Sequence, residues 1–106
     1  KTLPTIIFDE IDTGVSGDIA DRMGEVMKQM SAHLQVITIT HLPQVASKGE
    51  SHFVVYKEQS TTRLTRLGED DRITEIAKML SGSEITSAAM SQARILLGVE
   101  PKTTLF

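Results

Sequence analysis

Two adjacent carboxylates, Asp9 and Glu10, stand directly after the apolar run at residues 5–8. A short apolar run of this kind is typical of a buried strand in a parallel sheet, and α/β proteins bind ligands at the carboxyl ends of such strands. One acid at that edge can hold Mg²⁺ through its water shell, while the next can orient or deprotonate a water. This chemistry suits a nucleotide hydrolase. A strand that ends in a solvated acidic turn explains the two acids equally well.

A histidine, His41, follows a second strand-like run at residues 36–40, which is rich in β-branched residues. The loop and helix predicted between the two runs imply a right-handed parallel crossover. If the two strands are neighbours, a magnesium-bound phosphate at their common edge would meet Asp9, Glu10 and His41 together. Histidine suits a contact with phosphate because it can donate a hydrogen bond at neutral pH. A histidine at a strand end is usually structural, so only the neighbouring acids argue for a catalytic role.

The helix between these strands is predicted to begin near Ser16, a suitable amino-terminal cap, with Asp18 favourable in its first turn. Its larger apolar residues fall on one stripe, which we expect to face the core. That stripe contains Ile19, Met23, Val26, Met27 and Met30.

The rest of the chain predicts a short helical turn at 44–46, a hairpin of strands 53–56 and 61–67, and two helices. The first helix has an apolar stripe and a terminating glycine at Ile73, Ile76, Ala77, Leu80 and Gly82. The second has its stripe and terminators at Ala89, Ala93, Leu96, Leu97, Gly98 and Pro101. His33 and His52 have no acidic neighbours of this kind and are expected on the surface.

Composition narrows the possible classes. The chain has 106 residues, of which 40% are hydrophobic and 24% charged, as in one ordinary soluble domain. No apolar run approaches the roughly 20 residues of a membrane span. The absence of cysteine excludes disulfides and thiolate metal sites and agrees with a reducing cytoplasm. A net charge of -3 argues against a large nucleic-acid surface, although Arg63 and Arg66 offer a local basic strip.

Two segments carry a specific family resemblance. Residues 5–17 resemble the Walker B motif and D-loop of ABC-type ATPases, and residues 37–46 resemble their switch-histidine segment. With the hairpin and the helix at 72–80, the resemblance to the SMC group of these ATPases covers essentially the whole chain. It implies an α/β fold that is part of a P-loop NTPase head, with parallel strands and a crossover helix followed by a β-hairpin and two carboxyl-terminal helices.

The resemblance also implies roles for individual residues. Asp9 would support Mg²⁺, Glu10 would polarise the attacking water and His41 would contact the γ-phosphate of ATP. Four loop residues would pack against a second head and couple the two sites: Asp12, Gly14, Ser16 and Gly17.

The family hydrolyses ATP in a homodimer of heads, and this chain most resembles a branch that repairs DNA double-strand breaks by recombination. The resemblance therefore implies ATP and Mg²⁺ as cofactors, contact with DNA through the full-length protein, and a place in the DNA damage response. It also implies a cytoplasmic, nucleoid-associated protein with no membrane contact.

One part of the family pattern is missing. A Walker A loop needs glycine followed by lysine and Ser or Thr, and no glycine of this chain precedes a lysine. We therefore expect residues 1–106 to be a single carboxyl-terminal lobe of a longer ATPase, inactive when isolated. Residues 80–84 resemble the family's signature motif, but they follow the acids instead of preceding them, so a helix-ending turn is the expected structure.

Two other functions remain open. A receiver-like domain also holds Mg²⁺ in an acidic pocket and accepts a phosphoryl group on aspartate, but the second strand here ends in Thr40 and His41. The chain could also be a non-catalytic module for dimerisation or DNA contact.

Overall fold

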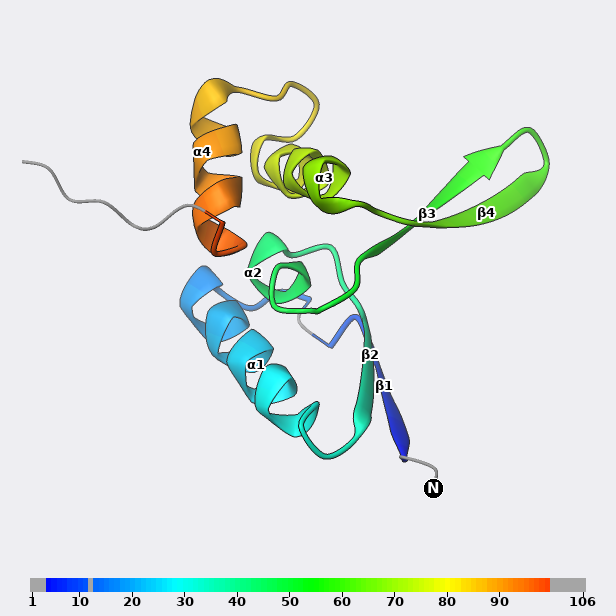
Figure 1. The fold of residues 1–106 in the computed structure, drawn as a ribbon, viewed down its shortest axis with the longest axis vertical. Helices are drawn as coiled ribbons and strands as arrows, with labels where there is room; N and C mark the ends of the chain where they lie inside the picture. The colour runs from blue at the N-terminus through cyan, green and yellow to red at the C-terminus, as the bar shows by residue number, and fades with distance from the viewer. Residues whose placement is uncertain (1–3, 12, 100–106) are drawn as a thin grey trace, which may run out of the picture. The chain divides into compact units, whose positions relative to one another are not determined.

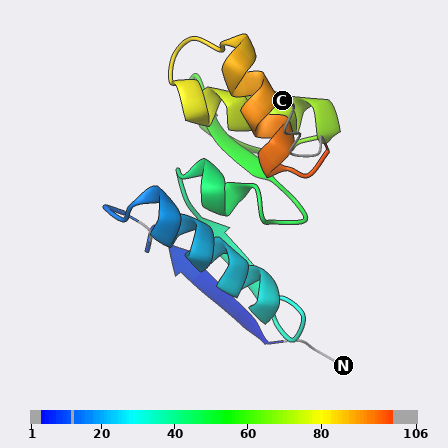
Figure 2. The ribbon, with the colours of Figure 1, turned by 90° about the vertical axis from the view of Figure 1, so that its left-hand side faces the viewer.

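The computed structural model describes residues 4–11 and 13–99, which fall into two compact units, Lys1–Gly49 and Glu50–Phe106. Figures 1 and 2 show the ribbon from two sides, and each unit is described here by itself. None of the described helices is long and apolar enough to cross a membrane.

The first unit has a strand, a helix, a second strand and a short helix. These are β1 (Thr5–Asp9), α1 (Gly17–Met30), β2 (Gln35–Ile39) and α2 (Pro43–Ala46). β1 and β2 are parallel neighbours, with Ile7 opposite Ile37 and Asp9 opposite Ile39. Helix α1 connects them and lies along one face of the pair (Figure 2). The predicted strand–helix–strand crossover with adjacent parallel strands is confirmed.

The buried face of α1 overlaps the predicted stripe only in part: Met27 is buried and Met23 packs against the core as predicted. Ala20, Gly24 and Met27 are buried, whereas Ile19 is 51% exposed and Val26 is 53% exposed. The buried residues recur at the helical spacing, and the two small ones leave room for α2 to pack closely on α1. The prediction that the larger apolar stripe faces the core is therefore wrong for Ile19 and Val26.

The start of α1 was predicted correctly in position but not in its capping bond. Ser16 is the residue before the helix and Asp18 lies in the first turn, but the Ser16 hydroxyl makes no capping hydrogen bond. Burial of the Ala20 face against the strands and α2 therefore stabilises this helix more than its cap does.

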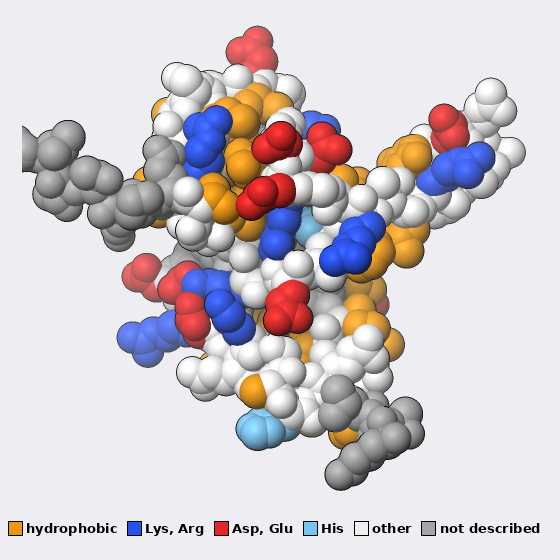
Figure 3. All heavy atoms as spheres, in the orientation of Figure 1, with side chains coloured by type: hydrophobic (Ala, Val, Ile, Leu, Met, Phe, Trp, Pro, Cys, Tyr) orange, Lys and Arg blue, Asp and Glu red, His pale blue; other side chains and the backbone are white. Residues whose placement is uncertain are grey.

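The second unit consists of an antiparallel hairpin followed by two helices. The elements are β3 (Phe53–Glu58), β4 (Thr61–Arg66), α3 (Glu69–Ser81) and α4 (Ser87–Leu96). A two-residue turn joins the strands, with Gln59 in the left-handed region at φ 57°. Hydrophobic side chains are visible on the surface of this hairpin (Figure 3). Its exposed hydrophobic residues include Phe53, Val55 and Leu64.

Helices α3 and α4 pack through the apolar residues that their spacing predicted. The buried ones are Ile73, Ile76, Ala77, Ala89 and Ala93. α3 ends at Gly82, whose φ of 83° is readily adopted only by glycine, and the Thr86 hydroxyl caps α4 by accepting a hydrogen bond from the Ala89 amide. Residues 80–84 are thus a helix-ending turn as expected. Pro101 lies outside the described residues.

The two histidines expected on the surface, His33 and His52, differ in how far they are exposed to solvent. His33 is exposed, as predicted, but His52 is half-buried and its Nδ1 atom is buried without a hydrogen-bond partner in the described part of the chain. The surface prediction is wrong for His52, because position 52 leads directly into β3 beside Arg72 of α3.

Candidate functional site

The parallel register of β1 and β2 places the predicted site residues at one edge of the sheet. Asp9 lies opposite Ile39 on the last rung of the ladder, and Glu10 follows Asp9. The Glu10 amide donates a hydrogen bond to the Ile39 carbonyl at 2.8 Å, which extends the pairing by one residue. His41 comes two residues after Ile39. Glu10 and His41 therefore lie just beyond the same rung of adjacent strands, which are about 4.8 Å apart.

Glu10 has an unusual backbone conformation. Its φ of 53° lies in the left-handed region, which side-chain-bearing residues rarely adopt. The Glu10 carbonyl accepts hydrogen bonds from the Thr13 hydroxyl at 3.0 Å and from the Thr13 amide at 3.4 Å. These hydrogen bonds hold Thr13 close to the end of β1. Strain of this kind is concentrated at functional sites in proteins.

His41 lies between the end of β2 and the start of α2. The Leu42 amide donates to the Thr40 hydroxyl at 3.0 Å, and Pro43 occupies the first turn of α2. Buried Val45 anchors α2 in the core of the unit. The His41 side chain is exposed, as are those of Asp9 and Glu10, so all three are accessible to a ligand.

The predicted dimer loop runs from the Glu10 turn to the start of α1. Gly14 has a φ of 81°, which favours glycine, and Gly14, Ser16 and Gly17 are all exposed. Asp12 lies outside the described residues. An exposed loop next to the acids is compatible with contact to a second molecule.

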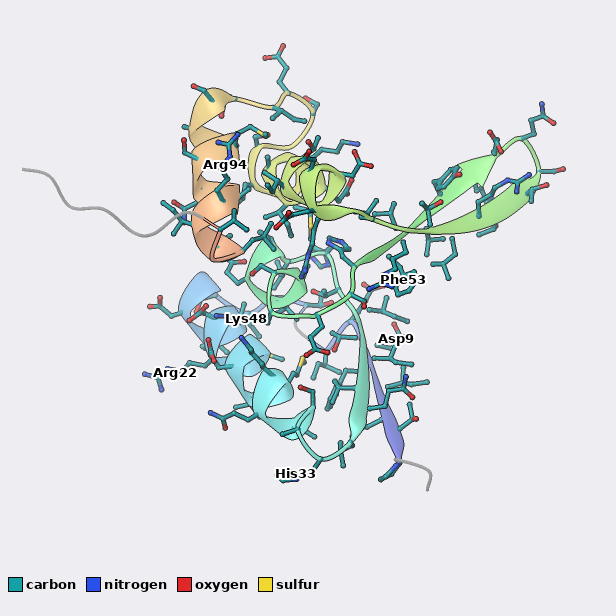
Figure 4. All side chains as sticks on the ribbon, viewed as in Figure 1. Asp9, Arg22, His33, Lys48, Phe53 and Arg94 are labelled. Carbon is teal, nitrogen blue, oxygen red and sulfur yellow. The ribbon has the colours of Figure 1, made fainter. Side chains whose placement is uncertain are left out.

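The donor set suits Mg²⁺ only if a substrate contributes ligands. Within residues 4–11 and 13–99, no group of three or more histidine or acidic side chains could hold a metal. Mg²⁺ keeps several waters and often binds through one or two carboxylates plus phosphate oxygens. The exposed Asp9 and Glu10 fit that mode of binding. Figure 4 labels Asp9, and it labels His33 near the other end of β2.

The two cavities that stand out in the described residues are elsewhere. One, of about 290 Å³, lies in the second unit and is lined by residues that include His52, Arg66 and Arg72. The other, of about 470 Å³, is an apolar groove of the first unit formed by β1 and the outer flank of α1. Neither cavity is lined by Asp9, Glu10 or His41. The candidate site therefore lies outside both cavities, at the exposed carboxyl edge of the β1–β2 sheet.

Solved structures define the class of fold. A chain from the work "Structural biochemistry of ATP-driven dimerization and DNA stimulated activation of SMC ATPases" matches 79% of this chain and 52% of its own length, with a TM-score of 0.68 at 18% identity. The Smc head domain of Pyrococcus yayanosii matches 74% of this chain and 15% of its own, with a TM-score of 0.65 at 20% identity. No protein-family model matches the chain. The fold is therefore that of part of an SMC-type head.

The sequence relatives are RecN proteins. The chain is 41% identical to the DNA repair protein RecN of Haemophilus influenzae over 101 residues, and 47% identical to RecN of Rickettsia conorii over 98 residues. RecN of Bacillus subtilis is 41% identical over 101 residues. These alignments cover 89–92% of this chain but only 18% of each relative. The chain thus resembles the carboxyl-terminal portion of RecN, and the predicted resemblance is confirmed.

Proposed function

We propose that this chain supplies the Walker B acids and the switch histidine to a composite ATP site in the head of a RecN-type DNA repair protein. Asp9 holds Mg²⁺ through water, Glu10 polarises the attacking water, and His41 donates a hydrogen bond to the γ-phosphate. MgATP, when bound, would supply the phosphoryl group, and its phosphate oxygens together with water would complete the coordination of the metal. The chain is one lobe, residues 1–106, and the phosphate-binding loop belongs to another part of the full-length protein.

The observation that carries this proposal is the register of the parallel strands. It supports a shared role for Glu10 and His41, which follow the same rung on neighbouring strands and are both exposed. A base and a hydrogen-bond donor at one sheet edge can act on the same phosphate, because the triphosphate of ATP is longer than one strand spacing.

The test measures ATP turnover and ATP binding in the full-length protein. Glu10→Gln should bind MgATP normally and lower kcat by about 100-fold or more, because the amide cannot accept a proton. Glu84→Gln, at another exposed glutamate, is the matched control and should keep normal turnover.

A second pair of variants tests the histidine. His41→Ala should lower kcat by roughly 100-fold, since one donor to the developing negative charge is lost. His33→Ala is its control, because His33 is also exposed and lies near the other end of β2 (Figure 4). Normal turnover in Glu10→Gln or His41→Ala would remove that residue from the mechanism.

The wider function follows from the relatives. The RecN relatives are DNA repair proteins, and one of the solved SMC neighbours comes from work on "ATP-driven dimerization" and "DNA stimulated activation". We place this chain accordingly in a cytoplasmic, nucleoid-associated homodimer of heads, with Asp12, Gly14, Ser16 and Gly17 at the dimer contact. Its role is recombinational repair of DNA double-strand breaks. The 106-residue chain alone should show no ATP turnover, because it contains no Gly-Lys pair.

The alternatives predict different results. A non-catalytic dimerisation or DNA-contact module keeps the ATP turnover of its parent protein after Asp9→Asn, whereas the proposal requires a large loss. A receiver-like domain is labelled by acetyl phosphate. It is disfavoured because β2 is followed by Thr40 and His41, with no aspartate at that strand end.

A further inference from the structure

One lysine connects the two helices of the first unit. The Lys48 ammonium lies 2.6 Å from Oε2 of Glu25 and 3.4 Å from Oδ1 of Asp21, both on α1. The Lys48 side chain is only 20% exposed, and its hydrogen bond to Glu25 raises the pKa of Lys48 despite the opposing effect of burial. Lys48 therefore remains charged at neutral pH and bridges two acids that lie one helical turn apart.

The segment that carries Lys48 also packs closely on α1. A β-carbon added at Gly24 would lie 3.1 Å from the Gln44 carbonyl oxygen and 2.8 Å from Cγ of Lys48. At Gly17 an added β-carbon would lie 3.4 Å from Nε2 of the Gln44 side chain. Residues 43–48 thus contact α1 from its first residue, where the predicted dimer loop ends, to its middle.

This segment begins two residues after His41. Because so few residues separate them, holding the segment on α1 also restricts the peptide that bears His41. Helix α1 follows the loop at 13–17 directly in the chain. Residues 43–48 follow the peptide that bears His41. A shift of α1 relative to β2 would therefore be passed to His41 through the contacts of Gln44, Val45 and Lys48.

We infer that Lys48 is a positioning residue for His41. Its bridge to Asp21 and Glu25 holds residues 43–48 on α1. When the loop at 13–17 contacts a second head, α1 and the attached segment together set the position of His41. The inference rests on the proposed function and adds to it a link between head association and the phosphate contact. Lys48 itself touches no substrate.

The first experiment measures steady-state ATP turnover of the full-length protein at several protein concentrations. Lys48→Met keeps the apolar stem but removes the charge, and it should lower kcat about tenfold, even at concentrations that saturate dimerisation, with KM for ATP little changed. Lys78→Met is the matched control, because Lys78 pairs with Glu75 at 3.9 Å within α3. It should turn over normally.

Two further variants separate positioning from simple loss of stability. Lys48→Arg should restore most of the turnover, and the exchange Lys48→Glu with Glu25→Lys should recover more than either single change. Normal turnover in Lys48→Met, or a loss that neither the arginine nor the exchange restores, would overturn the inference. If Lys48→Met fails to fold, the arginine and exchange variants still decide the matter.

His41→Ala distinguishes failure of the inference from failure of the proposed function. If His41→Ala turns over normally, the proposed role of His41 is wrong, whatever Lys48 does. If His41→Ala is inactive and Lys48→Met is as active as Lys78→Met, only the positioning role is wrong. NMR signals of the His41 ring in the 106-residue chain offer a readout without ATP, and they should shift in Lys48→Met and stay unchanged in Lys78→Met.

Discussion

Glu10 combines the chemistry proposed for it with a backbone conformation that disfavours any side chain. An L-residue in the left-handed region costs roughly 1–2 kcal/mol relative to the right-handed one, and glycine largely avoids that cost. The sequence shows the acid but not this strain, because a glutamate gives no local signal of a positive φ. The hydrogen bonds between Thr13 and the Glu10 carbonyl help to hold the turn.

This conformation predicts an inverted order of stability at position 10. Glu10→Gly should be more stable than Glu10→Ala by about 1 kcal/mol, because only glycine relieves the positive φ. At Arg22, an exposed residue in the interior of α1, alanine should instead be more stable than glycine by about 1 kcal/mol. Urea unfolding of the four variants checks both orders. Equal stability of Glu10→Gly and Glu10→Ala would show that position 10 is not strained.

The lowered pKa of His52 leads us to predict that the stability of the second unit depends on pH. Burial, and then the charge of Arg72, lowers the pKa of His52 below its ordinary value of 6.5, with Glu75 acting in the opposite direction. The folded state therefore binds fewer protons than the unfolded state once the pH falls below about 6.5. The free energy of unfolding has its full value above that pH and decreases as the pH falls through the pKa of the folded state.

The measurement is thermal unfolding at several pH values between 8 and 5. Tyr56, the sole tyrosine of the sequence, is in β3 and reports on this unit. Replacement of His52 by Gln should reduce the loss of Tm on acidification. His33→Gln, at an exposed position, should leave that loss unchanged. An identical pH profile for wild type and His52→Gln would contradict the prediction.

At the scale of elements, packing rather than propensity decides which face of α1 is buried. The order and type of the strands and helices follow from apolar spacing and turn residues, so the parallel pair, the hairpin and the later helices could be predicted. The buried face of α1 could be predicted only in part. Met27 is buried as expected, but Ile19 and Val26 are exposed, and the small residues Ala20 and Gly24 are buried instead. Lys48 was missed for a similar reason. Its partners are 23 and 27 residues away in sequence, and no local spacing indicates them.

Gly24→Ala tests this close packing of helices. In an ordinary helix interior the change stabilises by about 1 kcal/mol, but here the new methyl group would meet the Gln44 carbonyl and the Lys48 stem. We expect a net destabilisation of roughly 1–3 kcal/mol, since backbone must move to admit the methyl group. Urea unfolding measures it, and a double-mutant cycle with Lys48→Ala should show a smaller cost once the lysine stem is gone. A stabilising Gly24→Ala would refute the close approach.

At the scale of the molecule, the sheet of the first unit has one covered and one open face. Phe8 and Val36 pack against the core beneath α1, whereas three isoleucines on the opposite face are open to solvent. Their exposed fractions are 61% for Ile7, 43% for Ile37 and 49% for Ile39.

The candidate site was predictable as a set of residues at one strand edge. Its openness was not, because a two-stranded sheet supplies no wall opposite α1 and the chain spans only 18% of its relatives.

The open isoleucine face predicts self-association of the 106-residue chain. A contiguous apolar face on a sheet with unpaired edges favours association, whereas single exposed apolar residues are ordinary. Sedimentation velocity at tens of micromolar protein should show oligomers, and Ile37→Lys should shift the population toward monomer by placing a charge in the centre of the face. Ile85→Lys changes an exposed isoleucine of the second unit (41% exposed) and should leave the distribution unchanged. A monomeric wild-type chain, or equal effects of both lysines, would show that this face does not drive association.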